Sequence, residues 1–219
     1  MKTKRLFSEI VINEIRRNYP NADSVIREQE VWLRMDQIVN RLAKQSYFDN
    51  WAFTGGHSDE QYITSWADEN AITVVDQAHG RPSYLILPSN YADLPRNGGI
   101  EEIWPMTYAA GSNSVVIMSH RDYRRYQTNK AGNMQGRLYG YPQGQKFIFS
   151  RANVGTDFSE KFGVRLVIRD SSAIGLDAPY PVPSSAEQAI IDQLIEYFAG
   201  KLLRPMDAVR DGNEQPIEP

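Results

Sequence analysis

The segment from His120 to Arg137 holds the densest group of side chains that could do chemistry. Arginines alternate with tyrosines there, and guanidinium groups can hold phosphates while aromatic rings stack on bases. The same two residue types are also the usual anchors of protein–protein contacts. The candidate contact residues are Arg121, Tyr123, Arg124, Arg125, Tyr126, Lys130 and Arg137. Three interpretations stay open: an exposed solvated loop, a contact between subunits, or a nucleic-acid surface. The polar stretch around Gly132 favours a long arm that reaches a partner.

Other reactive side chains form no catalytic or metal-binding pattern. The three histidines, His57, His79 and His120, have no second histidine or carboxylate at ligand spacing on a predicted helix. Cysteine is absent, which excludes a thiol nucleophile and a disulfide. The neighbours Glu101 and Glu102 would point to opposite faces of a strand, which does not suit paired acid–base work. The sequence also lacks a phosphate-binding glycine loop and a nucleophile elbow. We therefore expect no catalytic residue, cofactor or metal, and we predict that the chain is not an enzyme.

Two helices are predicted at the start of the chain. Residues 4–18 place their apolar side chains on one stripe, and Pro20 ends that helix. Asp23 or Ser24 can cap a second helix, which runs to about Gln45. Its apolar side chains recur at helical spacing and are Val31, Met35, Ile38 and Leu42. The pair is typical of an αα-hairpin.

The pattern changes to short β-rich runs over residues 49–183. These runs are separated by glycine, proline and asparagine, which is typical of antiparallel strands. The expected strands are residues 71–75, 83–87, 114–118, 146–149 and 164–168, and residues 139–145 read as a turn. We therefore expect residues 49–183 to form a long antiparallel β-rich insertion domain.

A third helix is predicted from Ser184. Ser184 and Glu187 match a capping box, Gly200 suits the position just after a helix, and Pro205 forbids its extension. We expect residues 184–203 to return to residues 1–48 and complete a small helical bundle, which makes the chain an α+β protein. Residues 204–219 are polar and proline-bearing, so we predict an extended C-terminal tail.

Charge and hydropathy bear on partners and location. Residues 1–48 and 112–170 are net basic, while residues 49–111 and 171–219 are net acidic. Such alternation suits faces that meet oppositely charged faces of other subunits. No apolar run reaches the roughly 18 residues of a membrane span, and the N-terminal residues do not read as a secretory signal. We therefore expect no membrane partner and synthesis in a cytoplasm.

Three motifs occur in an order that resembles a known pattern. The first is the opening hairpin, with Val31-Trp32-Leu33-Arg34-Met35 leading to Asn40-Arg41-Leu42-Ala43. The second runs from Tyr84 to Leu94, through Leu87-Pro88-Ser89-Asn90-Tyr91, and is followed by Gly99-Ile100 and Ile103. The third is Ala178-Pro179-Tyr180-Pro181-Val182-Pro183, before the last helix, with Arg204-Pro205-Met206-Asp207 after it. In this order the chain resembles head-to-tail connector (adaptor) proteins of tailed phages, and its closing segment is similar to virion ring proteins of crAss-like short-tailed phages. Asn90 stands where that pattern has an acidic residue.

The resemblance implies a structural role in the virion. It implies a homo-oligomeric ring of about twelve copies in the neck, which holds the portal and tail proteins together around the DNA channel. The implied location is the virion, after assembly in the cytoplasm of the host bacterium. The candidates for a tail that docks on a neighbouring protein are Arg204, Pro205, Met206 and Asp207. The alternative is a nucleic-acid-binding module that uses segment 120–137; transient contact with viral DNA in the lumen is compatible with both.

Overall fold

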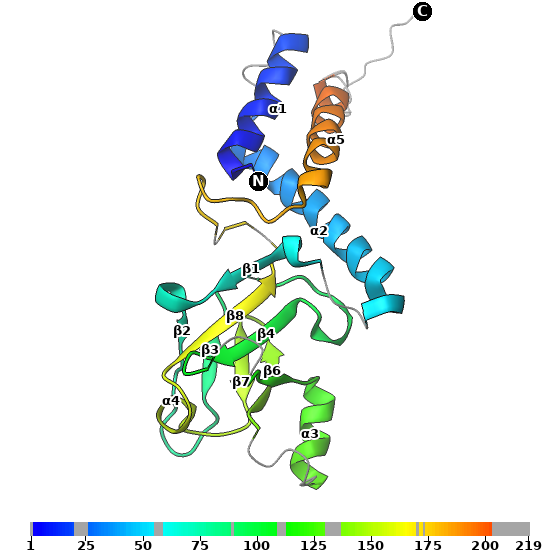
Figure 1. The fold of residues 1–219 in the computed structure, drawn as a ribbon. Coiled ribbons are helices and arrows are strands. Elements are labelled where there is room, and N and C mark those ends of the chain that lie inside the picture. Colours follow the sequence, from blue (N-terminus) through cyan, green and yellow to red (C-terminus); the bar gives the residue numbers. More distant parts are fainter. Residues whose placement is uncertain are drawn as a thin grey trace, which may run out of the picture.

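Helices from both ends of the chain gather at one end of the molecule, and a β-rich section lies at the other (Figure 1). The computed structural model describes residues 2–19, 26–54, 59–88, 90–108, 113–129, 137–169, 171–172 and 174–202. The α+β class expected from the sequence is confirmed. The α-helices are α1 (Lys4–Asn18), α2 (Glu28–Thr54), α3 (His120–Asn129), α4 (Val154–Asp157) and α5 (Ser184–Leu202). Within the described residues, no helix is long and apolar enough to cross a membrane.

The helices α1, α2 and α5 pack on one another in all three pairs. Each contributes a stripe of apolar side chains spaced three or four residues apart, which is the pattern of a helix with one buried face. The fully buried members of these stripes are Phe7, Val11, Ile15, Val31, Met35, Ile190, Leu194 and Phe198. The start of α1 is capped by Thr3, whose Oγ1 accepts a hydrogen bond from the Leu6 amide at 3.2 Å. The first and last segments of the sequence are therefore joined in one apolar core.

Three of the predicted helix ends are wrong. Helix α2 begins at Glu28 and not after Asp23 or Ser24, which lie outside the described residues. It continues past Gln45 to Thr54, because the buried Tyr47 still contacts the β section and donates its hydroxyl to the Pro95 carbonyl at 2.8 Å. Gly200 lies inside α5 and does not end it. Lys201 of the last turn pairs with Glu30 of α2 at 2.6 Å, which extends the contact between these helices beyond the glycine.

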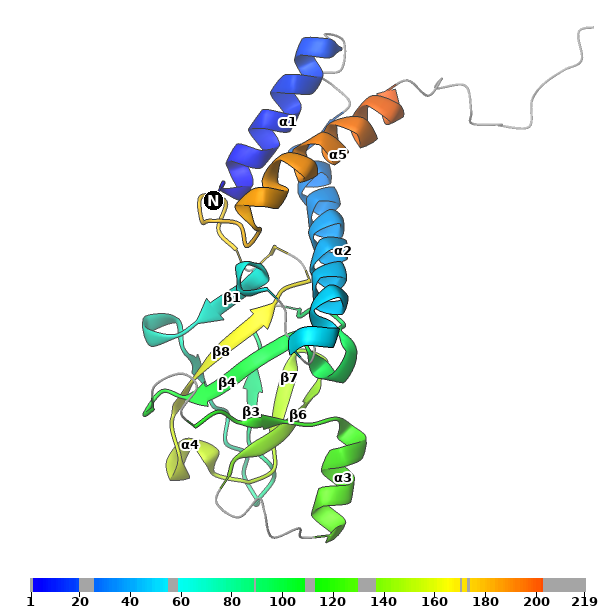
Figure 2. The ribbon, with the colours of Figure 1, turned by 45° about the vertical axis from the view of Figure 1, so that its right-hand side comes forward.

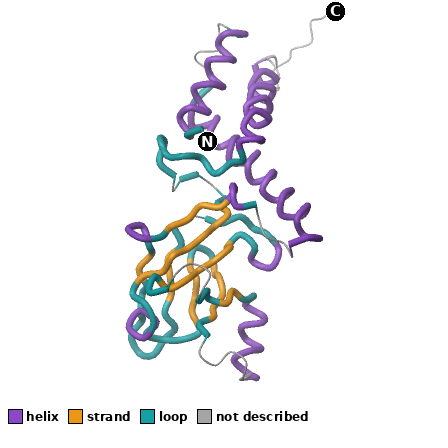
Figure 3. The backbone as a smooth tube through the Cα atoms, viewed as in Figure 1, coloured by secondary structure: helices purple, strands orange, loops and turns teal. Residues whose placement is uncertain are grey.

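Two sheets make up the β-rich section. In the first, β8 (Lys161–Val167) pairs with β1 (Ile63–Trp66) and β2 (Ile72–Thr73) along one edge and with β4 (Ile100–Pro105) along the other. In the second, the strand order is β3 (Tyr84–Ile86), β7 (Lys146–Phe149), β6 (Tyr139–Gln143) and β5 (Val116–Ile117). All pairs are antiparallel except β5–β6, which is parallel. The expectation of a purely antiparallel insertion is wrong at this pair, because α3 crosses between β5 and β6 (Figure 3).

Aromatic side chains fill the space between the sheets. The ring of Phe149 on β7 lies 5.1 Å from the ring of Phe162 on β8, and both side chains are fully buried. On β8 the neighbouring Gly163 has no side chain, and a Cβ there would stand 2.3 Å from the Trp104 ring. The glycine thus permits the close approach of β4 and β8. The apolar core continues from these sheets into the helices without a break.

A partly buried carboxylate on α2 joins the helices to the β section. Asp36 accepts hydrogen bonds from the amide and the hydroxyl of Ser171, both at 3.1 Å, and from the hydroxyl of Tyr180. Both partners lie in the segment that links β8 to α5. Lys4 of α1 reaches the same place, where its Nζ donates to the Ser171 carbonyl at 3.3 Å. Burial raises the pKa of Asp36, although these hydrogen bonds and Lys4 oppose the shift.

A second polar contact ties the N-terminus to α5. Glu187, predicted to close a capping box, accepts from the Lys2 amide at 3.2 Å and from the Lys2 Nζ at 2.5 Å. These bonds hold the pKa of Glu187 below its usual range. Lys2, two residues before the start of α1, is thereby fixed against the first turn of α5.

We predict that Asp36→Ala lowers the free energy of unfolding by about 2 kcal/mol, because it leaves buried donors of Ser171 and Tyr180 without their acceptor. Urea unfolding followed by circular dichroism measures the change. The control is Asp49→Ala, which removes an exposed carboxylate from the same helix. A loss no larger than that of the control would show that Asp36 does not hold the junction.

Candidate functional site

The Arg–Tyr segment begins as a helix. The expectation of a loop over residues 120–137 is wrong for its first part, because His120–Asn129 forms α3. Ser119 caps this helix: its Oγ accepts from the Asp122 amide at 3.1 Å and donates to the Asp122 carboxylate at 2.6 Å. A serine followed three residues later by an acidic residue is a start signal for a helix, so this signal was present in the sequence.

Tyr123 belongs to the core and cannot stack on a base. Its side chain is only 6% exposed, and its ring lies 4.5 Å from Tyr141 and 6.1 Å from Tyr139 on β6. Burial raises the pKa of Tyr123, with a further contribution from these two neighbouring tyrosines. The hypothesis of alternating arginines and stacking tyrosines therefore fails at this position.

The arginines of α3 lie on the surface. Arg121, Arg124 and Arg125 are exposed, and their spacing of three and four residues puts them on one stripe, away from Tyr123. Arg137, just before β6, is also exposed. The structure thus brings together part of the predicted contact set at the end of the molecule farthest from α1 and α5 (Figures 1 and 2).

Several of the predicted contact residues lie, in whole or in part, outside the described residues. The backbone of Tyr126 is part of α3, but its side chain lies outside the described residues. Lys130 lies outside them as well, and so do the candidate docking residues of the tail, which are Arg204, Pro205, Met206 and Asp207.

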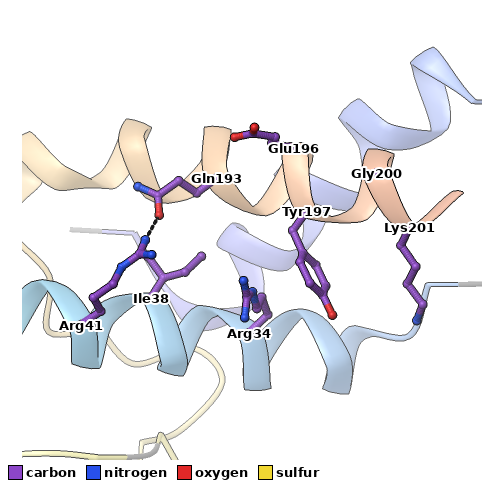
Figure 4. Close-up of a pocket in the computed structure, with 8 residues that line it drawn as sticks. All are labelled: Arg34, Ile38, Arg41, Gln193, Glu196, Tyr197, Gly200 and Lys201. Carbon is purple, nitrogen blue, oxygen red and sulfur yellow. Dashed lines mark hydrogen bonds between the residues drawn. The ribbon is translucent and has the colours of Figure 1, made fainter. Parts of the chain in front are cut away.

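A groove between α2 and α5 was not predicted from the sequence. Figure 4 looks into this groove, which has a volume of about 550 Å³. Its lining residues are Arg34, Ile38, Arg41, Gln193, Glu196, Tyr197, Gly200 and Lys201. The Arg34 guanidinium lies 4.2 Å from the centre of the Tyr197 ring, and Arg41 donates to the side chain of Gln193. These two contacts hold both arginines along the wall of the groove.

A second hollow continues from the first at Arg41, which lines both. It has a volume of about 440 Å³, lies between α2 and the β section, and is lined by Gln37, Asn40, Arg41, Lys44, Asp93 and Arg169. Within this lining, the side-chain amide of Asn40 donates to the Arg169 carbonyl. We refer to the two hollows together as the α2 groove.

Positive charge is in excess in the α2 groove. Arg34, Arg41, Lys44 and Arg169 have no ion pair with a carboxylate of the described residues, whereas Lys201 is paired with Glu30. The carboxylates in the lining are Asp93 and Glu196. Guanidinium and ammonium groups arranged in this way can bind the carboxylates or phosphates of a partner. Metal binding has less support, since the described residues contain no group of three or more side chains of the types that hold a metal ion.

The α2 groove was not predicted from the sequence, because its charged side chains come from segments that are far apart along the chain. The spacing of Arg34, Arg41 and Lys44 on the predicted helix was the available signal, since it keeps them on neighbouring turns. Arg169 follows β8 and Lys201 lies in the last turn of α5, so only the contacts of these two segments with α2 bring all the charges together.

No family model matches the chain, and no curated protein sequence matches it either.

We predict that Tyr123→Ala lowers the free energy of unfolding by about 3 kcal/mol, because it empties a buried site between α3 and β6. The matched change Arg121→Ala, on the exposed stripe of the same helix, should alter it by less than about 0.5 kcal/mol. Thermal and urea unfolding of both variants measures the difference. If both variants changed the free energy of unfolding by the same small amount, Tyr123 would again be a candidate for a surface contact.

Proposed function

We propose that this chain is a structural subunit of a virion, and that copies of it form a ring in the head-to-tail connector of a short-tailed phage. The ring holds the portal and tail proteins together around the DNA channel. In this role α1 and α2 act as an αα-hairpin, α5 completes a three-helix bundle with them, and the β section projects from the bundle as a separate contact module. The subunit performs no catalysis.

The observation that carries the proposal is the order of the sequence motifs and of the helices and strands along the chain. The sequence motifs resemble connector proteins in their order of occurrence, and the helices of the first and last segments come together around an inserted β section. A ring requires two different faces on each subunit, because each copy presents one face to the next copy and the other to the previous one. A helical part and a β part at opposite ends of α2 offer such different faces.

Exposed apolar side chains add support for contacts with other proteins. Leu33 and Phe48 stand on the outward side of α2, with 61% and 56% of their surface exposed. The other large apolar side chains on the surface are Leu6, Ile86, Tyr108, Leu176 and Tyr197. Apolar and aromatic side chains at the surface are the usual anchors of protein interfaces when they are grouped with arginine. Tyr197 meets this condition, because Arg34 stacks on it.

The test is electron microscopy of virions together with the purified chain. We expect the chain to be a component of purified particles, and an averaged map of the neck should contain a ring into which the described residues fit. Particles that lack the chain, or a neck whose rings cannot accommodate this fold, would contradict the proposal. Association of the isolated chain is a weaker test of the ring, because some ring subunits associate only when they are bound to their partner protein.

A nucleic-acid-binding module is the second candidate. The observation that favours it is the exposed stripe of Arg121, Arg124 and Arg125 on α3. It predicts binding to DNA that weakens steeply as salt increases, since neutralised phosphates release counterions.

Changing Arg121, Arg124 and Arg125 together to Gln should then reduce the affinity for a DNA duplex at least about tenfold at low salt. Fluorescence anisotropy of a labelled duplex measures this affinity for the unchanged chain and for the variant. The control is the change of Arg41 and Lys44 to Gln in the α2 groove, which removes positive charge elsewhere. No binding by the unchanged chain at low salt would dispose of this candidate.

A further inference from the structure

The α2 groove presents positive charge that the described part of the chain does not neutralise. Arg41, Lys44 and Arg169 are exposed, and Arg34 is held beside them against Tyr197. All four belong to rigid elements or to the backbone anchored by Asn40. A binding surface built on packed helices keeps its charges in place, which favours one specific partner over general attraction.

An exposed acidic corner lies between β1 and β2. The short helix η3 (Asp68–Asn70) turns the chain there, and the amides of Asn70 and Ala71 donate to the carbonyls of Ala67 and Asp68 at 3.0 and 3.2 Å. Asp68 has a φ of 52°, in the left-handed region that aspartate tolerates better than most residues. Asp68 and Glu69 are both exposed, and neither has an ion pair within the described residues. We refer to residues 68–70 as the η3 corner.

The η3 corner and the α2 groove lie on opposite sides of the chain. Figure 4 shows α1 behind α2 and α5, on the far side of the side chains that line the groove. In Figures 1 and 2 the turn between β1 and β2 projects on the side of α1, near the height of the C-terminal end of α2. Two copies in the same orientation, one displaced toward the helical end of the other, would therefore bring the corner of the displaced copy toward the groove of the other.

We propose that the α2 groove of each copy receives the η3 corner of the next copy, with Asp68 and Glu69 seated against Arg41, Lys44 and Arg169. The inference rests on the proposed ring, and it names the surfaces that form it. The contact is heterologous, so it repeats from copy to copy and closes a ring when the rotation between copies divides a full turn. Because the charged groups lie at the surface, salt weakens the contact.

A DNA duplex fits the same groove less well. A duplex brings a continuous row of phosphates, and the carboxylates of Asp93 and Glu196 in the wall of the groove repel part of that row. The η3 corner brings only two carboxylates on a narrow turn. Charge complementarity over a small area therefore favours a second copy of this chain.

Disulfide trapping tests the contact directly, because the chain contains no cysteine. The variant carries Lys44→Cys in the groove and Asn70→Cys at the corner, both at exposed positions. Under mild oxidation we expect a ladder of dimers, trimers and larger species on a non-reducing gel, since each copy can be linked to two others. One control pairs Lys44→Cys with Arg121→Cys on the distant α3. A second control is each single-cysteine variant, which can yield no more than dimers because each copy then has one linking position.

A charge exchange in the same cysteine variant makes the test specific. Arg41→Glu alone, or Glu69→Lys alone, should reduce the yield of linked species at least about fivefold, because each places like charges opposite one another. Both changes together should restore most of the yield, since the pair is then attractive again. Circular dichroism melting of each variant checks that the fold is retained.

The outcomes separate this inference from the proposed ring. A neck ring in virions assembled from the cysteine variant, with no ladder above the control after oxidation of the particles, would overturn the groove–corner contact and leave the ring standing. A ladder that responds to the charge exchange, in a chain absent from virions, would support the contact and contradict the virion role. If Arg41→Glu removes DNA binding and leaves the ladder unchanged, the groove is a nucleic-acid surface and the inference is wrong.

Discussion

The partly buried carboxylate of Asp36 is the constraint on which the arrangement of the molecule depends. It accepts from Ser171 and Tyr180, so it fixes both ends of the segment that leads from β8 back to α5. Asn40, one turn further along α2, adds a second polar tie by donating to the Arg169 carbonyl at the start of the same segment. Burial opposes ionisation of Asp36 and raises its pKa, and the hydrogen bonds from Ser171 and Tyr180 offset part of this effect. The position of α5, and with it one wall of the α2 groove, follows from this junction.

Helix α2 then acts as the spine of the molecule. Its 27 residues span about 40 Å at 1.5 Å per residue. Its first half packs on α1 and α5, and Tyr47 in its second half is anchored to the β section. The exposed side of this helix carries both the basic residues of the groove and the apolar side chains of Leu33 and Phe48. A single rigid helix thereby links the placement of the contact surface to the placement of both parts of the fold.

Sequence reasoning succeeded where local signals agree with the tertiary structure. The bounds of α1 and the positions of β3, β7 and β8 were predictable, because apolar periodicity and turn residues decide them locally. It failed at the end of α2 and at Gly200, where contacts with distant elements extend a helix beyond its local stop signal. It also failed at Tyr123, since a tyrosine beside arginines gives no local sign of whether it faces solvent or a strand.

The sequence by itself determined the α+β class and the helix–strand–helix order, and it supplied the candidate arginines, because these follow from residue type and spacing along the chain. Only the tertiary structure decided which of the charges meet. Arg34, Arg41 and Lys44 form a groove with Arg169 and Lys201 because α5 packs against α2 and Asn40 of α2 holds the backbone of Arg169. The physical reason is that charge complementarity depends on distance in space, whereas sequence patterns report only neighbours along the chain.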